Sequence, residues 1–76
     1  MLTVNRRATG KRIEKAIRSK GLTYKQTAEL AEVSLGAISN WTTGYCLPSI
    51  DTMARLIQVL DCGFDDLICL SAGEKE

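Results

Sequence analysis

The chain has 76 residues, of which 45% are hydrophobic, and its formal net charge is +1. This length fits one small domain, and the hydrophobic share is too high for a disordered chain. No apolar run reaches about 18 residues, which excludes a transmembrane helix, and no apolar stretch follows the basic N-terminus as it would in a secretion signal. We therefore expect a cytoplasmic protein with no membrane partner.

Capping residues and apolar spacing predict five helices, and no strand pattern of any length is present. The first helix is expected over residues 9–20 with Thr9 as its N-cap. Residues 1–8 would precede it as a basic arm. Its inward side chains, three and four positions apart, would be Ile13, Ala16 and Ile17.

The second and third helices begin at clear capping signals. Thr23 and Gln26 form a capping box at the start of a helix over residues 24–31. Its inward side would hold Ala28 and Ala31, with Thr27 or Leu30. Ser34 caps the third helix, which ends at about residues 42–43 and turns Ile38 and Trp41 inward. The side chains left on its outward face are Leu35, Gly36, Ser39 and Asn40.

Ser49 caps the fourth helix, which carries the clearest apolar stripe of the chain. That stripe consists of Ile50, Met53, Ala54, Ile57 and Leu60. A fifth helix is expected over residues 64–70, with Phe64 and Leu67 closing the core. Residues 71–76 would form a C-terminal tail.

The small net charge hides an asymmetry along the chain. Residues 1–25 hold eight basic residues and one acidic residue (8 − 1 = +7), whereas residues 26–76 hold two basic and eight acidic residues (2 − 8 = −6). A basic end can face a polyanion while the acidic end faces water or a partner. The alternative is that these charges only coat helix surfaces.

The three cysteines, Cys46, Cys62 and Cys69, form no CxxC pair, and the chain has no histidine. A zinc site would need all three thiols and an acid at unfamiliar spacing, so we expect no metal and no cofactor. Small, partly buried hydrophobes in a reducing compartment are the expected role, and a regulatory thiol is the alternative. No carboxylate is paired with a base or a glycine-rich loop, so we do not expect an enzyme.

The order of these signals resembles the phage-repressor family, the Cro/CI or Xre-type helix-turn-helix regulators. The resemblance covers about residues 9–68 without a gap. The residues that carry it are Gly21-Leu22-Thr23, Ala28, Val33-Ser34, Ile38-Ser39, Trp41, Gly44, Pro48-Ser49, Thr52, Leu56, Leu60, Asp65 and Leu67. It implies an all-α, compact five-helix lambda-repressor-like domain with the helix-turn-helix at its second and third helices.

The resemblance also implies roles for individual residues on double-stranded DNA. The third helix would enter the major groove, with Leu35, Gly36, Ser39 and Asn40 at the base-reading positions. Phosphate contacts would come from Thr23, Tyr24, Lys25, Ser34, Thr43, Gly44 and Tyr45. The basic arm could add Arg6, Arg7, Lys11 and Arg12. Since Asn40 suits adenine and Leu35 a thymine methyl, we expect readout that favours A·T pairs.

Two departures from the family pattern bear on the fold. The family often pairs an arginine in the first helix with a glutamate after the third-helix aromatic residue, where this chain has Ile17 and Thr42. Because both partners are changed, no half of a buried ion pair would remain. Glu32 replaces the usual glycine of the turn, and a glutamate is strained there if the site requires a positive φ.

The resemblance implies a transcriptional regulator, and we expect a repressor that acts by occupying its operator. One third helix covers only part of a site, so we expect a homodimer through Ile68, Cys69 and Leu70. Two alternatives stay open. The chain could be an antitoxin-type partner that grips another protein through its acidic C-terminal half, or a protein-interaction module that has lost DNA binding.

Overall fold

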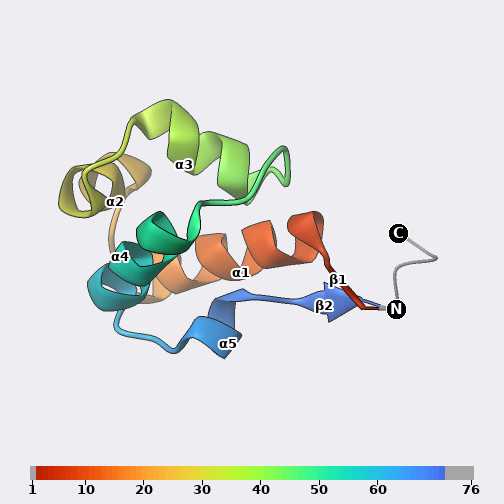
Figure 1. Cartoon of the computed structure of the whole chain (residues 1–76). Helices are drawn as coiled ribbons and strands as arrows, with labels where there is room; N and C mark the ends of the chain where they lie inside the picture. The colour runs from red at the N-terminus through yellow and green to blue at the C-terminus, as the bar shows by residue number, and fades with distance from the viewer. Residues whose placement is uncertain (1, 72–76) are drawn as a thin grey trace.

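The computed structural model describes residues 2–71, which form five helices and one antiparallel pair of two-residue strands (Figure 1). The helices are α1 (Arg6–Ser19), α2 (Tyr24–Ala31), α3 (Leu35–Thr42), α4 (Ile50–Leu60) and α5 (Phe64–Leu67). The strands are β1 (Thr3–Val4) and β2 (Leu70–Ser71). Among the described residues, no helix is both long and apolar enough to span a bilayer.

Helix α1 begins three residues earlier than predicted, because its N-cap is Asn5. The Asn5 side chain accepts a hydrogen bond from the backbone N–H of Ala8 at 2.9 Å. Thr9, the predicted cap, lies inside the helix and is fully buried. Most of the predicted arm therefore belongs to regular structure: residues 3–4 form a strand, and residues 6–8 are the first turn of α1.

The two ends of the described chain are joined, which the sequence did not indicate. Val4 pairs with Leu70 and Thr3 with Ser71 across the two strands. Helix α5 accordingly ends at Leu67, and the predicted extension to residue 70 is wrong, because residues 70–71 are extended. Of the predicted tail, Ser71 belongs to β2, and residues 72–76 lie outside the described part of the chain.

One hydrophobic core fills the space between the helices, and α1 crosses it. Helix α1 packs against α3 on one side and α5 on the other, while α2 packs against α3 and α4 (Figure 1). The core residues are Ile13, Ile17, Ala28, Ala31, Ile38, Trp41, Met53, Leu56, Leu60 and Leu67. The inward positions predicted for α3, and Ile13 and Ile17 of α1, are thereby confirmed.

Two predictions about the core are wrong. The buried stripe of α4 is centred on Thr52, Met53, Leu56 and Leu60. Ile50 is instead 75% exposed, and Ala54 is exposed as well. Phe64 does not close the core: its side chain is 47% exposed, and Leu67 alone fills that role on α5.

Candidate nucleic-acid interface

The predicted capping box holds the start of α2. The Thr23 hydroxyl accepts from the Gln26 N–H at 3.0 Å, and the Gln26 side chain accepts from the Thr23 N–H at 2.9 Å. These bonds fix the direction in which the first turn points. Tyr24 is half-buried and Lys25 is exposed, so both side chains can reach the surface at this helix end.

Helix α3 separates an inward face from an outward one. Ser34 caps it by accepting from the Ala37 N–H at 3.1 Å. Ile38 and Trp41 are buried, and this anchors the helix to the core. All four predicted base-reading residues lie on the exposed face: Leu35, Gly36, Ser39 and Asn40. The structure thus brings this set together on one surface.

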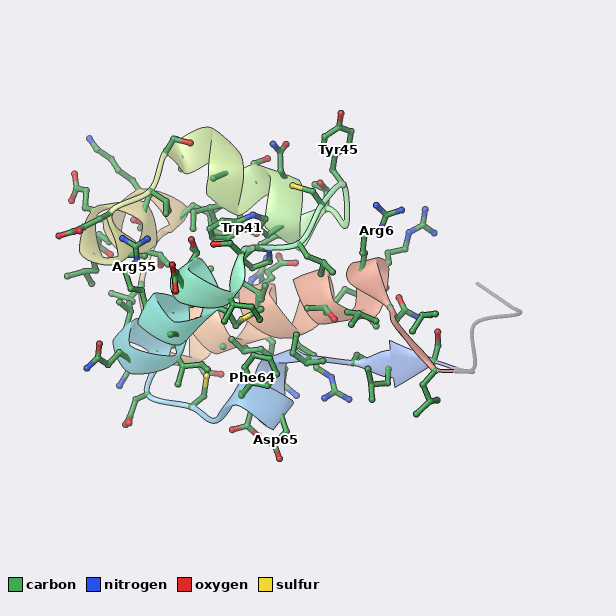
Figure 2. The ribbon with its side chains drawn as sticks, viewed as in Figure 1. Arg6, Trp41, Tyr45, Arg55, Phe64 and Asp65 are labelled. Carbon is green, nitrogen blue, oxygen red and sulfur yellow. The ribbon has the colours of Figure 1, made fainter. Side chains whose placement is uncertain are left out.

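The loop after α3 is fastened to the end of that helix. The backbone N–H groups of Tyr45 and Cys46 both donate to the carbonyl of Asn40, at 2.9 and 3.3 Å. The Thr43 hydroxyl donates to the Ser39 carbonyl at 2.9 Å. Tyr45 itself is 74% exposed and points away from the body of the molecule (Figure 2). The backbone of Asn40 is therefore held by the same loop that presents Tyr45.

Helix α1 packs closely against α3, and a glycine of α1 lies at their contact. A Cβ on Gly10 would collide with the backbone carbonyl of Trp41. Ile17 of α1 is buried, and the Thr42 hydroxyl at the end of α3 donates to the Ser39 carbonyl at 3.2 Å. No buried side-chain polar atom of residues 2–71 is left without a partner. This agrees with the expected coordinated replacement of the family ion pair at Ile17 and Thr42.

The four predicted arm contacts do not lie together. Arg6, Arg7 and Lys11 line one hollow beside Gly44, at the end of the molecule that carries the loop after α3. Arg12 points the other way, toward α5, where its guanidinium donates to the Asp65 carbonyl at 3.5 Å. The structure therefore groups three of the four beside the loop that follows α3.

The predicted dimer residues form the link between α5 and β2. Ile68 and Cys69 are half-buried, and Leu70 is 54% exposed. The Cys69 N–H donates to the Thr9 hydroxyl at 3.0 Å, and the Cys69 carbonyl accepts from the Asn5 N–H at 2.7 Å. The backbone of this segment is thus committed to the monomer fold, which leaves the Leu70 side chain as its most accessible apolar group.

All three cysteines are reduced and half-buried. Burial, and then the nearby Asp66 and Asp61 carboxylates, raise the pKa of the Cys62 thiol above its ordinary value, so this sulfur stays protonated at neutral pH. No cluster of three or more metal-ligating side chains occurs among residues 2–71.

Sequence reasoning missed the structural roles of Asn5 and Gly10, and it assigned the wrong role to Thr9. Gly10 had a signal, since glycine inside a helix lowers stability and usually has a packing reason. Asn5 is a good N-cap residue type, and this was the signal that could have located the start of α1. The role of Thr9 as an acceptor depends on Cys69, far along the chain, and had no local signal.

Three solved structures share this arrangement. The restriction-modification controller protein C.AhdI from Aeromonas hydrophila superposes with a TM-score of 0.76 at 21% identity, over 80% of this chain and 92% of that one. The clp gene regulator ClgR from Corynebacterium glutamicum gives 0.78 at 26% identity, over 86% and 69%. The biofilm master regulator SinR, solved in complex with DNA, gives 0.74 at 28% identity, over 78% and 95%.

Among proteins with curated descriptions, none matches this chain. Residues 13–67 match the helix-turn-helix family HTH_3. The matched range runs from the middle of α1 to the end of α5. That range contains both helices of the motif and the loop that fastens α3. The chain therefore belongs to the helix-turn-helix family of the Xre, Cro and CI type, a non-enzymatic family of DNA-binding transcriptional regulators.

Proposed function

We propose that this protein is a sequence-specific repressor that inserts α3 into the major groove and acts in the cytoplasm by occupying its operator. One observation carries the proposal: the outward face of α3 is exposed along its length, while both ends of the helix are held by hydrogen bonds. A helix held in this way can meet base edges without losing further conformational freedom. The similarity to SinR, which was solved with DNA bound, supports this use of the surface.

The side chains on α3 suggest what is read. Asn40 can make the paired contact to adenine, and Leu35 can pack on a thymine methyl. Gly36 lets the backbone approach the bases, and Ser39 is a short donor. Backbone phosphates would be held by Thr23, Tyr24, Lys25, Ser34, Thr43, Gly44 and Tyr45. The preferred operator should therefore be rich in A·T pairs.

One α3 contacts only a few base pairs, and a two-fold dimer would double the number of base pairs that are read. We place its contact at Ile68, Cys69 and Leu70. Leu70 is 54% exposed, and Val4, its partner on the neighbouring strand, is 36% exposed. These two side chains supply exposed apolar area for the contact. The test is the mass in solution, measured with and without operator DNA. A mass of one chain under both conditions would remove the dimer from the proposal.

Selection of bound sequences from random duplex DNA tests the function itself. We expect a palindromic winner rich in A·T, bound with an affinity that falls steeply with salt. Asn40→Ala should then weaken binding by about 1–3 kcal/mol, with the loss concentrated at one base position per half-site. A loss spread evenly over all positions would mean that Asn40 does not read a base.

A protein partner is the second candidate, favoured by the exposed Phe64 on α5. This ring is 47% exposed and belongs to the acidic part of the chain, on an element that packs on the side of α1 away from α3 (Figure 1). An antitoxin-type regulator could hold its partner there while α3 stays free. If no sequence is enriched even at low salt, a protein-binding role becomes the better explanation.

A further inference from the structure

Three cations meet at one end of the molecule, and among residues 2–71 no acid lines the hollow that they share. Arg6, Arg7 and Lys11 line a hollow whose other residues are Thr3, Val4, Asn5, Ala8 and Gly44. Within residues 2–71, the ion pairs are Arg18–Glu14, Lys20–Asp61 and Arg55–Glu32. None of the three cations takes part in them. Their charge is therefore available to a ligand.

Three other basic residues, two on α1 and one at its C-cap, lie in a different setting. Arg12, Lys15 and Lys20 line a second hollow together with Asp61 and Asp66. Because the acids offset their charge, that hollow has no strong preference for a polyanion. The two hollows thus divide six basic residues into an uncompensated group, Arg6, Arg7 and Lys11, and a compensated group, Arg12, Lys15 and Lys20.

Two members of the uncompensated group, Arg6 and Arg7, also lie where their charge does not stabilise the fold. Arg6 and Arg7 are the first two residues of α1, whose first turn holds no acid. The N-terminal end of a helix carries partial positive charge, so cations there are unfavourable for folding. A stability role does not explain two arginines at this helix end, whereas an anionic ligand would meet both the side chains and the helix dipole.

This end of α1 packs closely against the loop that follows α3. Gly44, with φ of 84°, lies so close to α1 that a Cβ there would be 2.9 Å from the Cα of Arg7. The Gly44 N–H donates to the Trp41 carbonyl at 3.1 Å, which continues the connection into α3. Arg6 and Tyr45 project from this same end, on the α3 side of α1 (Figure 2). A duplex positioned on α3 therefore has its backbone directed toward these cations.

We propose that Arg6, Arg7 and Lys11 form a second phosphate-binding surface, which takes the DNA backbone flanking the half-site read by α3. The ligand is the phosphodiester chain of the same duplex. This inference rests on the proposed function, and it adds a contact that carries no base information but holds α3 in register. Arg12, which the sequence groups with these residues, is not part of this surface.

The test compares two variants that lose the same charge. The first is Arg6→Gln/Arg7→Gln/Lys11→Gln, and the control is Arg12→Gln/Lys15→Gln/Lys20→Gln. Affinity for the selected operator is measured against salt. We expect the slope of log K on log[salt] to become shallower by about 2–3 in the first variant, since each lost phosphate contact changes it by about 0.9. The control should change it by less than about 1.

A second measurement locates the contact on the DNA. Shortening the duplex to the selected half-sites should remove the difference between the wild type and the first variant, because the flanking phosphates are then absent. The first variant should also keep the base preference of the wild type, and its unfolding midpoint should not fall, since it removes two cations from the N-terminal end of α1.

The outcomes separate this inference from the proposed function. Equal slopes for the two variants, or a changed base preference in the first, would overturn the flanking-phosphate surface while leaving a sequence-specific regulator in place. Binding by the wild type without any base preference would overturn the proposed function; the slopes, then measured on an arbitrary duplex, would still show whether Arg6, Arg7 and Lys11 bind backbone phosphates. Failure of the wild type to bind any duplex would overturn both.

Discussion

The turn between α2 and α3 is closed by a glutamate in a conformation that favours glycine. Glu32 has φ of 61° and ψ of 47°, in the left-handed region, as anticipated for a site where the family uses glycine. Its carboxylate lies 3.7 Å from the Arg55 guanidinium on α4, and both side chains are exposed. An exposed pair of this kind contributes little, so it offsets only part of the backbone strain.

Glu32→Gly should raise the free energy of unfolding by about 0.5 kcal/mol, because relief of left-handed strain exceeds the lost ion pair and the added freedom of the unfolded chain. Glu32→Ala keeps the strain and loses the pair, so it should lower stability by up to about 1 kcal/mol. Denaturant unfolding of the two variants is the measurement. Changes of the same sign in both would show that φ at this residue carries no strain.

At the scale of the helices, the contact between α1 and α3 depends on one glycine, and a second glycine gives the matched control. Gly10→Ala forces a methyl against the Trp41 carbonyl and should lower the free energy of unfolding by about 1–3 kcal/mol. Gly36 has open space, with its nearest neighbour at 4.0 Å, so Gly36→Ala should raise stability by about 0.5–1 kcal/mol.

The same pair of variants separates stability from DNA binding. Gly36→Ala adds a methyl to the proposed reading surface, and we expect weaker operator binding from a more stable protein. Thermal unfolding and operator titration on both variants check this. An unchanged affinity in Gly36→Ala would indicate that the backbone of α3 does not approach the bases closely.

Helix boundaries marked by a capping residue could be predicted from the sequence. Which side of a helix faces the core could not be predicted for α4. Thr23, Ser34 and Ser49 cap α2, α3 and α4 where the sequence predicts, because a capping bond involves residues only three apart. Helix α4 has apolar side chains around more than half of its circumference. Its spacing alone could not tell whether Ile50 or Leu56 faces the core, since that depends on where α2 and α5 pack.

At the scale of the whole molecule, the hydrogen bond between Cys69 and Thr9 joins the C-terminal segment to α1 and can be tested. Thr9→Val removes the acceptor of the Cys69 N–H and leaves a partly buried donor unpaired, which should cost about 1–3 kcal/mol of stability. Thr9→Ser keeps the acceptor and should retain slow hydrogen exchange at the Cys69 amide, whereas Thr9→Val should speed that exchange. Equally slow exchange in both variants would show that the bond does not hold this segment.

The strands could not be predicted because each has only two residues and its partner lies at the other end of the chain. No alternation of apolar and polar residues can be recognised in so short a segment. The exposed face of α3 was more accessible to sequence reasoning, since the four residues predicted to read bases were chosen from those that do not face inward, and all four are exposed. The placement of Arg12 was not, because it depends on the direction of α1 relative to α5.

Joining the two ends of the chain also has a consequence for the order in which the protein can form. The pairs Thr23–Gln26 and Ser34–Ala37 close small loops, whereas Val4–Leu70 closes a loop around almost the whole described chain. Closing a large loop costs more entropy and comes late in folding. The caps of α2 and α3 can therefore form before the two strands pair, and β1 takes its place only when residues 70–71 reach it.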